Sequence, residues 1–548
     1  MPPRPPFPKA RHTWLALAAA EPALQEPDAM SWPLGLAPTR EAATLPSALS
    51  VDLAAPARAA QQCEAADGKS TPARCASSLE GREEACTQAA AAAREGEAVL
   101  LEGIDRWWRL GPDGAGFCQS CGAALRERLR ESYGEHFERY DALAALRAKG
   151  AVRERPFGGL REELRLAEAV EAVKETAQRA RDEARRQRGL ELPILGRADA
   201  LSPPALLLAR HLDGLVFPLP STDPWQCLLP LLAARAALGQ RPAIALAPPE
   251  ATEEQVRQLA ALCTACDADL ALLPAASRGA QTALGEHRRY LATMRERLKQ
   301  AAPLADFLVL ASPRADAWAG GAHFAAASLA AAAIARLHLQ ISVSLELPIP
   351  GPRTPLVMAG PGGLSPDEAQ AARRHVADGG DLLLVAAWSV LDDEGRAVEK
   401  LFPEAKAGLN RSGEGRIWAI TPDGEPPSAP QLEAQVARAA RELLGRGRAS
   451  LSLTGRGSLL VRGYLDPERK LDVHLVNLEM RDTGPVAAQG LTLHLAGQVA
   501  GGGRSGYWFA PDRDQGSAGE RIALNAAGFG VSTVLPRLGG SALLTIPR

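Results

Sequence analysis

The feature that most constrains the fold is a regular alternation of short apolar runs and longer helical patterns, which begins near residue 98. Five apolar runs predict buried strands, at residues 98–105, 192–199, 212–220, 241–249 and 267–275. Residues 160–187 carry small and apolar residues at helical spacing, with charged residues at the other positions. Strands that alternate with helices in this way are typical of βα units and a parallel sheet. The sequence therefore predicts an α/β fold that begins with a (β/α) barrel.

Residues 1–97 leave the completeness of this barrel open. They are rich in proline and offer only two strand candidates, residues 12–20 and 48–55. An eightfold barrel needs about three further βα units in that stretch, so the room for them is tight. We therefore expect a barrel over residues 1–304 that is either complete or shortened.

A second α/β unit is expected over residues 305–447. Ser365, with Glu368 three residues later, forms a capping box that begins one of its helices. The glycine-rich residues 359–363 lack the spacing of a nucleotide-binding loop. No cysteine follows Cys266, so this unit cannot contain a thiol nucleophile. We expect a flavodoxin-like domain with an architectural or oligomerisation role.

Residues 448–548 follow a third pattern. Short runs in which apolar and polar residues alternate are separated by turn residues, without a helical pattern between them. Such a series predicts a small β-sandwich. Three units suit a chain of 548 residues, because a domain usually has about 100–200 residues.

The charge balance excludes several classes of partner. The chain has 62 lysines and arginines and 64 aspartates and glutamates, so no net field attracts nucleic acid or an anionic membrane. No apolar run approaches the roughly 18–20 residues that span a bilayer. The N-terminus has basic residues before a short apolar stretch near Ala20, which fits either a weak secretory signal or a first buried strand. We expect a cytoplasmic protein, with secretion as the alternative.

Two carboxylates end the first predicted strand. Glu102 and Asp105 lie at the end of residues 98–105, and the carboxyl ends of strands are where barrel enzymes assemble their sites. Because the two residues are three positions apart, a regular strand points them to opposite sides. We expect Glu102 to point inward and Asp105 to lie in the loop above it, as a candidate substrate ligand. The alternative is a structural carboxylate that binds a loop or Arg106.

Aromatic and charged residues follow several strand ends. Trp107 and Trp108 come directly after the two carboxylates, and Trp225 follows a later strand. Aromatic rings at the rim of a barrel suit the apolar faces of sugar rings, although one of the first two tryptophans is equally suited to packing. Arg197 and Asp199 end another strand and could bind sugar hydroxyls, with an internal salt bridge as the alternative.

All 8 cysteines lie in the first half of the chain, which favours metal ligands or small buried side chains over a disulfide framework. Cys75 lies in a loop that enters a helix, and Cys118 and Cys121 lie in the loop after the next strand. These three can meet at the carboxyl face of the barrel. Cys263 and Cys266 end a helix just before a strand, at the opposite face, where we expect them to pack as small apolar side chains.

The segment "CASSLEGREEACTQAAAAAREGEAVLLEGIDRWWRLGPDGAGFCQSCGAALRERLRESYGE" resembles a stretch of the family 42 β-galactosidases and related glycoside hydrolases. The later segments "LPILGRADAL", "LDGLVFPLPS", "LSPDEAQAARRHVADGGDLLLV" and "VHLVNLE" resemble, in order, pieces of the later barrel strands, the amidotransferase-like trimerisation domain and the C-terminal sandwich of that group. The resemblance covers roughly residues 70–548 and depends on the order of the pieces more than on any one motif.

This resemblance implies hydrolysis of a β-galactoside-like or other oligosaccharide by a homotrimer, without a dissolved cofactor. Glu102 matches the strand-four carboxylate that serves as general acid/base. Hydrolysis also needs a second carboxylate from a later strand end. Pro218 stands near the place where relatives often have a glutamate. Asp223 is the first replacement that we consider, followed by Asp199 and Glu250.

The resemblance also implies a structural zinc ion. Resembling galactosidases hold zinc with four cysteines and use the pattern CxCxxC in the second loop. Gly116 occupies the first of those positions, so Cys63 is expected to join Cys75, Cys118 and Cys121 around a tetrahedral ion. Reduced, partly buried thiols without a metal are the alternative.

The departure at Pro218 leaves two functions open. One is a glycoside hydrolase that uses Glu102 and Asp223. The other is a catalytically inactive barrel that binds carbohydrate or serves as a scaffold.

Overall fold

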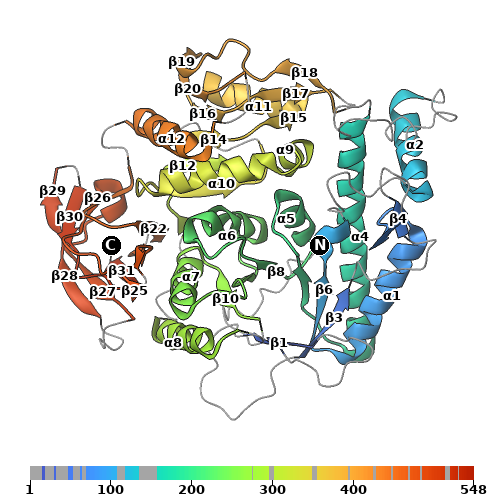
Figure 1. The fold of residues 1–548 in the computed structure, drawn as a ribbon, viewed down its shortest axis with the longest axis horizontal. Coiled ribbons are helices and arrows are strands. Elements are labelled where there is room, and N and C mark those ends of the chain that lie inside the picture. The colour runs from blue at the N-terminus through green and yellow to red at the C-terminus, as the bar shows by residue number, and fades with distance from the viewer. Residues whose placement is uncertain are drawn as a thin grey trace.

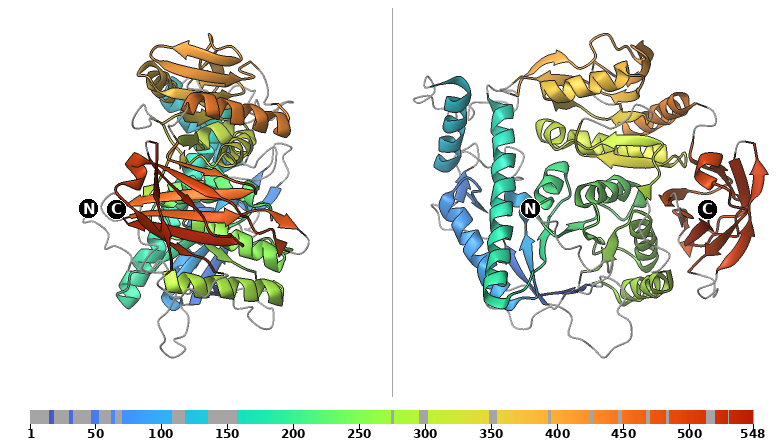
Figure 2. Two further views of the ribbon diagram at one scale, coloured as in Figure 1. Left: turned by 90° about the vertical axis from the view of Figure 1, so that its left-hand side faces the viewer. Right: turned by 180° about the vertical axis from the view of Figure 1, so that it is seen from behind.

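The computed structural model contains three parts, which Figures 1 and 2 show from three directions. A parallel sheet with its helices forms the first part, a second α/β unit lies above it in Figure 1, and a two-sheet β unit lies at one side. The described residues are 15–18, 30–32, 47–52, 62–64, 70–107, 118–134, 157–273, 276–294, 302–347, 354–392, 395–423, 427–445, 449–466, 470–481, 484–511, 519–528 and 530–547.

The first part is built on an eight-stranded sheet with the order β10-β9-β8-β7-β6-β3-β1-β2. Neighbouring strands pair in parallel, except that β2 runs antiparallel to β1 at the edge. No pairing joins β10 to β2 in the described part of the chain, so closure of the barrel stays a prediction. The strands are β1 (Leu15–Ala18), β2 (Met30–Trp32), β3 (Ser47–Asp52), β6 (Ala98–Glu102), β7 (Ile194–Arg197), β8 (Gly214–Pro218), β9 (Ala243–Leu246) and β10 (Asp269–Ala271).

Helices follow most strands of this sheet, as the alternating pattern predicts. The long helix expected at residues 160–187 is present as α4, and its small apolar residues pack against α1, beside which it lies in Figure 1. A hairpin of β4 (Gln62–Glu64) and β5 (Ser70–Arg74) precedes α1. The helices are α1 (Leu79–Glu95), the 3-10 helix η2 (Ile104–Trp107), α2 (Gln119–Tyr133), α4 (Gly158–Arg188), α5 (Pro203–Ala209), α6 (Pro224–Leu238), α7 (Glu253–Ala265) and α8 (Arg278–Met294).

The two faces of the sheet belong to different apolar clusters. The cluster on the inner face consists of Ala98, Leu100, Leu195, Val216, Ile244, Leu246 and Ala271. Intervening residues such as Val99, Leu101 and Phe217 belong to a larger cluster that contains the helices. Because side chains alternate along a strand, the first cluster marks the interior of the barrel sheet. A residue that continues this alternation at the carboxyl end of a strand faces the mouth.

The second part is a doubly wound sheet with the order β13-β12-β14-β16-β20-β19. Numbered along the chain, its parallel strands have the order 2-1-3-4-5, which is that of a flavodoxin-like sheet. β19 adds an antiparallel edge. The strands are β12 (Phe307–Leu310), β13 (Ile341–Ser344), β14 (Leu356–Met358), β16 (Asp381–Val385), β19 (Gly408–Ser412) and β20 (Gly415–Ile420), with a small sheet of β15 (Gly362–Leu364), β17 (Trp388–Leu391) and β18 (Ala397–Lys400) beside them.

The helices of the second part include one that is apolar on all sides. α10 is rich in alanine and packs between α6 of the first part and α12 of the second. A helix without a polar face is stable only when it is surrounded, so this contact joins the two parts into one core. The capping box of Ser365 and Glu368 is present at α11. The helices are α9 (Pro313–Trp318), α10 (Ala322–Ala335), α11 (Pro366–Ala377) and α12 (Ala429–Leu444).

The third part is a β-sandwich of two antiparallel sheets, β11-β22-β23-β31-β27-β28 and β21-β26-β30-β29. β11 corrects the predicted boundary at residue 304, because it pairs with β22 of the sandwich. A short helix α13 (Gly497–Ala500) and a hairpin of β24 (Met480–Arg481) and β25 (Gly484–Pro485) add to the expected strands. The sheets contain β11 (Ala302–Pro303), β21 (Leu451–Thr454), β22 (Leu459–Asp466), β23 (Lys470–Asn477), β26 (Thr492–Ala496), β27 (Ser505–Phe509), β28 (Glu520–Ala523), β29 (Asn525–Ala527), β30 (Gly530–Val534) and β31 (Ser541–Pro547).

A close backbone contact joins the first part to the second. Gly159, in the first turn of α4, lies against Gly395, in the loop between β17 and β18. A Cβ atom on Gly159 would lie 2.5 Å from the Cα atom of Gly395. The Trp318 indole donates a hydrogen bond to the Gly395 carbonyl oxygen at 3.3 Å, which fixes the loop further. Glycine is therefore required here by the approach of two backbones.

We expect Gly159→Ala to separate these two backbones and lower the melting temperature. Overpacking of this kind typically costs about 1–3 kcal/mol in the free energy of unfolding. Gly285→Ala is the matched control, because a Cβ atom there meets nothing within 4 Å. Removal of glycine flexibility from α8 should leave the control unchanged or raise its stability slightly. Equal melting temperatures for the two variants, measured by circular dichroism, would contradict this account.

Candidate functional site

The carboxyl ends of β6 and β7 place two opposite charges at the mouth of the barrel sheet. Glu102 pairs in register with Arg197, and its Oε2 lies 3.5 Å from the arginine Nη1. Glu102 continues the alternation of Ala98 and Leu100, so it lies on the inner face of the sheet. The side chains of Glu102 and Arg197 are 28% and 27% exposed, so the pair is accessible from the mouth. These two groups offer a hydrogen-bond acceptor and several donors to a polar ligand.

The far wall of the same mouth is apolar. Val216 pairs with Arg197, and Pro218 follows two positions later on the same face of β8. Pro218 pairs in turn with Leu246, which pairs with Ala271. The inward residues at the described ends of β8, β9 and β10 therefore include no carboxylate.

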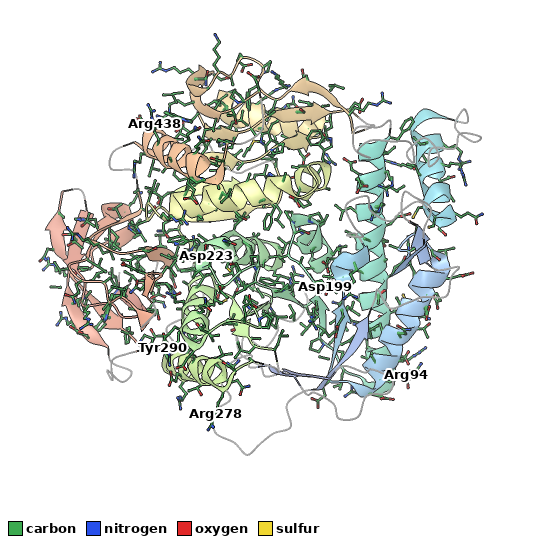
Figure 3. The ribbon with its side chains drawn as sticks, in the orientation of Figure 1. Arg94, Asp199, Asp223, Arg278, Tyr290 and Arg438 are labelled. Atoms are coloured by element: carbon green, nitrogen blue, oxygen red, sulfur yellow. The ribbon has the colours of Figure 1, made fainter. Side chains whose placement is uncertain are left out.

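The structure places the three candidates for a second carboxylate in loops. Asp223 caps α6: its Oδ1 accepts a hydrogen bond from the Trp225 backbone N–H at 3.0 Å, and its Oδ2 accepts one from the Gln226 amide at 3.3 Å. Asp199 forms an ion pair with Arg106. Figure 3 shows Asp199 near the centre of the barrel sheet and Asp223 apart from it, toward the sandwich. Glu250 is exposed in the turn before α7. Their catalytic roles stay predictions.

Asp105 is a structural residue, which corrects its prediction as a sugar ligand. It is 2% exposed. Its two carboxylate oxygens accept hydrogen bonds from the backbone N–H groups of Asp199 and Ala200, at 2.8 and 3.2 Å. Burial raises the pKa of the Asp105 carboxyl group above its usual value, and the two backbone donors oppose that shift. Asp105 thus holds the loop after β7 beside the Glu102–Arg197 pair.

Trp225 is buried, so it offers no exposed ring as the predicted sugar platform. It is 8% exposed, and its indole donates a hydrogen bond to the Ser458 hydroxyl of the sandwich at 3.3 Å. The Arg336 guanidinium, just after α10, lies 5.0 Å from the centre of its ring. Trp225 therefore connects the three parts of the chain. Trp108 and the side chain of Trp107 lie outside the described residues.

Three thiols form a compact triangle, as predicted for Cys75, Cys118 and Cys121. The sulfur of Cys75 lies 3.4 Å from those of Cys118 and Cys121, which are 3.5 Å from each other. All three are buried, and they are the one group in the described part of the chain with metal-ligand geometry. Cys63 lies on β4, which pairs with the strand that leads to Cys75, but its side chain lies outside the described residues.

Two residues beside the thiols were missed by the sequence analysis. The Ser77 hydroxyl oxygen lies 3.3 Å from the Cys121 sulfur and donates a hydrogen bond to the Glu168 carboxylate on α4. Burial raises the pKa of Glu168 above its usual value. No sequence pattern joins residues separated by 91 positions, so only the fold reveals this contact.

Cys263 and Cys266 are fully buried beneath the barrel helices and lie apart from the thiol triangle. Burial raises the pKa of Cys266 to about 12 and raises the pKa of Cys263 well above its usual value. Thiols that resist ionisation are inert, because the thiolate is the reactive and metal-binding form. These cysteines pack as small apolar side chains.

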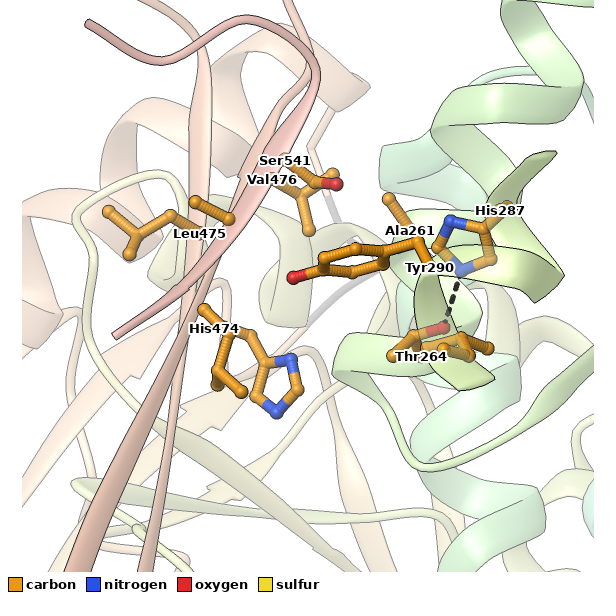
Figure 4. A pocket seen from close by; sticks show the side chains of 11 residues that line it. Ala261, Thr264, His287, Tyr290, His474, Leu475, Val476 and Ser541 are labelled. Atoms are coloured by element: carbon orange, nitrogen blue, oxygen red, sulfur yellow. Dashed lines mark hydrogen bonds between the residues drawn. The ribbon is translucent and has the colours of Figure 1, made fainter. Parts of the chain in front are cut away.

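A small pocket lies between α7 and α8 of the first part and β23 and β31 of the sandwich (Figure 4). Its polar lining includes Thr264, His287, Tyr290, His474 and Ser541. His287 donates a hydrogen bond from Nε2 to the Thr264 hydroxyl at 2.8 Å, because that hydroxyl donates its own proton to a carbonyl oxygen of α7. Thr264 is near the end of α7, where the chain enters the amino end of β10. The pocket thus lies away from the mouth that contains Glu102.

A buried histidine fills the switch point of the flavodoxin-like sheet, where such folds usually bind ligands. His323 accepts a hydrogen bond at Nε2 from the Ser312 backbone N–H at 3.1 Å and donates one from Nδ1 to the Ala359 carbonyl oxygen at 2.7 Å. It thereby joins the loops after β12 and β14. The ring of Trp388 packs edge to face against it, with 5.2 Å between the ring centres.

No helix among the described residues is both long and apolar enough to cross a membrane. No family model matches the sequence, and no curated protein matches it either.

Solved structures match the chain over most of its length. A β-galactosidase from Bacillus circulans sp. alkalophilus has a TM-score of 0.62 at 12% identity, with 92% of this chain and 89% of that chain covered. A catalytic mutant of a GH42 β-galactosidase from G. stearothermophilus has a TM-score of 0.63 at 12% identity, with 92% and 88% covered. Alpha-L-fucosidase isoenzyme 2 from Paenibacillus thiaminolyticus has a TM-score of 0.59 at 13% identity, with 92% and 87% covered. The chain therefore has the fold of the GH42 β-galactosidases, which confirms the predicted resemblance at the level of the fold.

Two buried histidines predict a loss of stability in mild acid. Burial lowers the pKa of His287 and of His323 from 6.5 to about 4. Between pH 6.5 and 4 the unfolded chain binds these protons and the folded chain does not, so the free energy of unfolding falls as the pH falls. Each histidine contributes up to about 1.4 kcal/mol per pH unit in that window.

Melting temperatures at several pH values between 7 and 4 test this expectation. His287→Gln and His323→Gln should each be less stable than the wild type at pH 7 and should lose less stability on acidification. Variants that lose stability with pH as steeply as the wild type would show that neither histidine is neutral in the folded chain.

Proposed function

We propose that this chain binds carbohydrate at the mouth of its barrel sheet and does not hydrolyse it. The observation that carries the proposal is the apolar far wall of that mouth. Glycoside hydrolysis needs two carboxyl groups on either side of the scissile bond, about 5–5.5 Å apart for retention or 6.5–9.5 Å apart for inversion. Glu102 has no such counterpart at the described ends of β8, β9 and β10, where Pro218 and Leu246 stand. Asp52 at the end of β3 pairs in register with Glu102, so it stands beside Glu102 on the neighbouring strand and not across a bound sugar.

The composition of the mouth suits a sugar. Arg197 and Glu102 can bind hydroxyl groups through donors and acceptors, and the partly exposed Pro218 can contact the C–H face of a pyranose ring. Small-molecule sites commonly combine a mostly apolar lining with a few polar groups that orient the ligand. The similar structures act on a β-galactoside or an α-L-fucoside by their names, so we propose a β-galactoside-like or related oligosaccharide as the ligand.

A second candidate function is glycoside hydrolysis. It is favoured by the position of Glu102 on the inner face of the sheet, where a general acid would protonate the glycosidic oxygen. Asp223 would then have to leave its capping position on α6 to act as nucleophile or base, with the loss of about 1 kcal/mol of helix capping.

We also propose structural roles for the cysteine cluster and for the flavodoxin-like part. Cys75, Cys118, Cys121 and Cys63 would hold one zinc ion, since a tetrahedral ion with zinc–sulfur bonds of about 2.3 Å separates its sulfur ligands by about 3.8 Å, close to the observed triangle. The flavodoxin-like part, with its switch point filled by His323, would serve assembly into a homotrimer. Light scattering of the purified protein measures the mass of the assembly and so tests whether it is a trimer.

Binding and turnover can be measured on the same proteins. We expect titration calorimetry with galacto-oligosaccharides to detect binding to the wild type. Arg197→Ala should bind about 10–100-fold more weakly, because it loses hydrogen bonds to a charged group. Arg185→Ala, which removes an exposed arginine of α4, should bind like the wild type.

Turnover of a panel of aryl glycosides separates the two candidate functions. We expect the wild type and Glu102→Gln to release no more aglycone than the buffer does. Turnover by the wild type that is lost in Glu102→Gln would establish the hydrolase and contradict the binding proposal.

A further inference from the structure

We propose that Ser77 and Glu168 form an outer shell around the thiol site, through which a bound metal ion fixes helix α4. This proposal depends on the metal site proposed for Cys75, Cys118 and Cys121 and goes beyond it. It assigns a role to two residues that are not thiols and that belong to different elements. Their roles are to position a ligand, since neither needs to touch the ion.

The contacts form a continuous chain from one thiol to α4. The Ser77 hydroxyl oxygen lies 3.3 Å from the Cys121 sulfur and also contacts the Glu168 carboxyl group. A metal-bound Cys121 is a thiolate and can only accept, so Ser77 would donate its one proton to the sulfur and accept one from a protonated Glu168, whose pKa is raised by burial. Cys121 lies in the first turn of α2, Ser77 lies in the loop before α1, and Glu168 lies on α4. This series of contacts therefore joins three segments that are far apart in the sequence. Side chains that hold metal ligands in place in this way typically change metal affinity by 10–100-fold when they are removed.

The charges around Glu168 favour a cation in the triangle. Metal-bound cysteines are thiolates, so a neighbouring carboxylate is repelled unless a cation lies between the charges. Burial raises the pKa of Glu168, and the positive charges of Arg82 and Arg165 oppose that shift. Arg82 also donates a hydrogen bond to the carbonyl oxygen of Ala76, between Cys75 and Ser77. Four thiolates with one divalent ion leave two negative charges, which these two arginines can balance beside a protonated Glu168.

The same contacts explain how a metal would stabilise this side of the barrel. α2 contacts α4, and α4 packs along α1. Cys118 is the residue before α2 and Cys121 is in its first turn, so an ion that binds both fixes the start of α2. Ser77 and Glu168 then extend that constraint to α4. The ion would therefore order α1, α2 and α4 as one unit.

Metal affinity measures this role directly. Reduced full-length protein is loaded with zinc, and its affinity is determined by competition with a chromophoric chelator. We expect Ser77→Ala and Glu168→Ala to bind zinc about 10–100-fold more weakly than the wild type. Glu171→Ala is the matched control, because Glu171 lies on the same helix, is exposed and pairs with Lys174.

Hydrogen exchange supplies a second measure, in which the zinc-loaded and zinc-free forms of the same protein are compared. Zinc removal from the wild type should increase amide exchange in α4 around Glu168, and Ser77→Ala should abolish that difference. Equal zinc affinity of the wild type and both variants would overturn the outer shell. Absence of stoichiometric zinc in the reduced wild type would overturn the metal site as well, and neither result bears on carbohydrate binding.

Discussion

The in-register pairing of β6 with its parallel neighbours determines what the barrel mouth can do. Because Glu102 stands opposite Arg197, both charged side chains point inward and bind each other at 3.5 Å. The same alternation continues across β8 and β9, where it brings Pro218 and Leu246 to the far wall. A shift by one residue would bury the charges and expose the core. The register thus produces a mouth that is polar on one wall and apolar on the other.

The three parts of the chain depend on one another for burial. α6 and α10 are apolar on nearly every side, so each is stable only because the other covers it. Trp225 extends this contact to the sandwich through Ser458 and to the end of α10 through Arg336. In the flavodoxin-like part, His323 occupies the switch point and joins the loops after β12 and β14.

Local patterns predicted the architecture better than they predicted the site. Periodicity predicted α4, the order of the βα units and the change to a sandwich. The positions of Cys75, Cys118 and Cys121 in neighbouring loops predicted that their thiols lie together. The sequence could not show that Asp105 turns inward to bind backbone N–H groups, or that Trp225 lies beneath Arg336, because both outcomes depend on segments distant in the chain. Ser77 and Glu168 escaped detection for the same reason.

The central claim is that the mouth holds a sugar beside Glu102 and Arg197, and that the described inward ends of β8, β9 and β10 supply no second acid to cleave it. Mass spectrometry of an oligosaccharide recovered after prolonged incubation with the wild-type protein tests this claim most directly. The account predicts a ligand that is retained by the protein and recovered at its original mass. Recovery of shorter sugars, produced by the wild type and absent with Glu102→Gln, would contradict it.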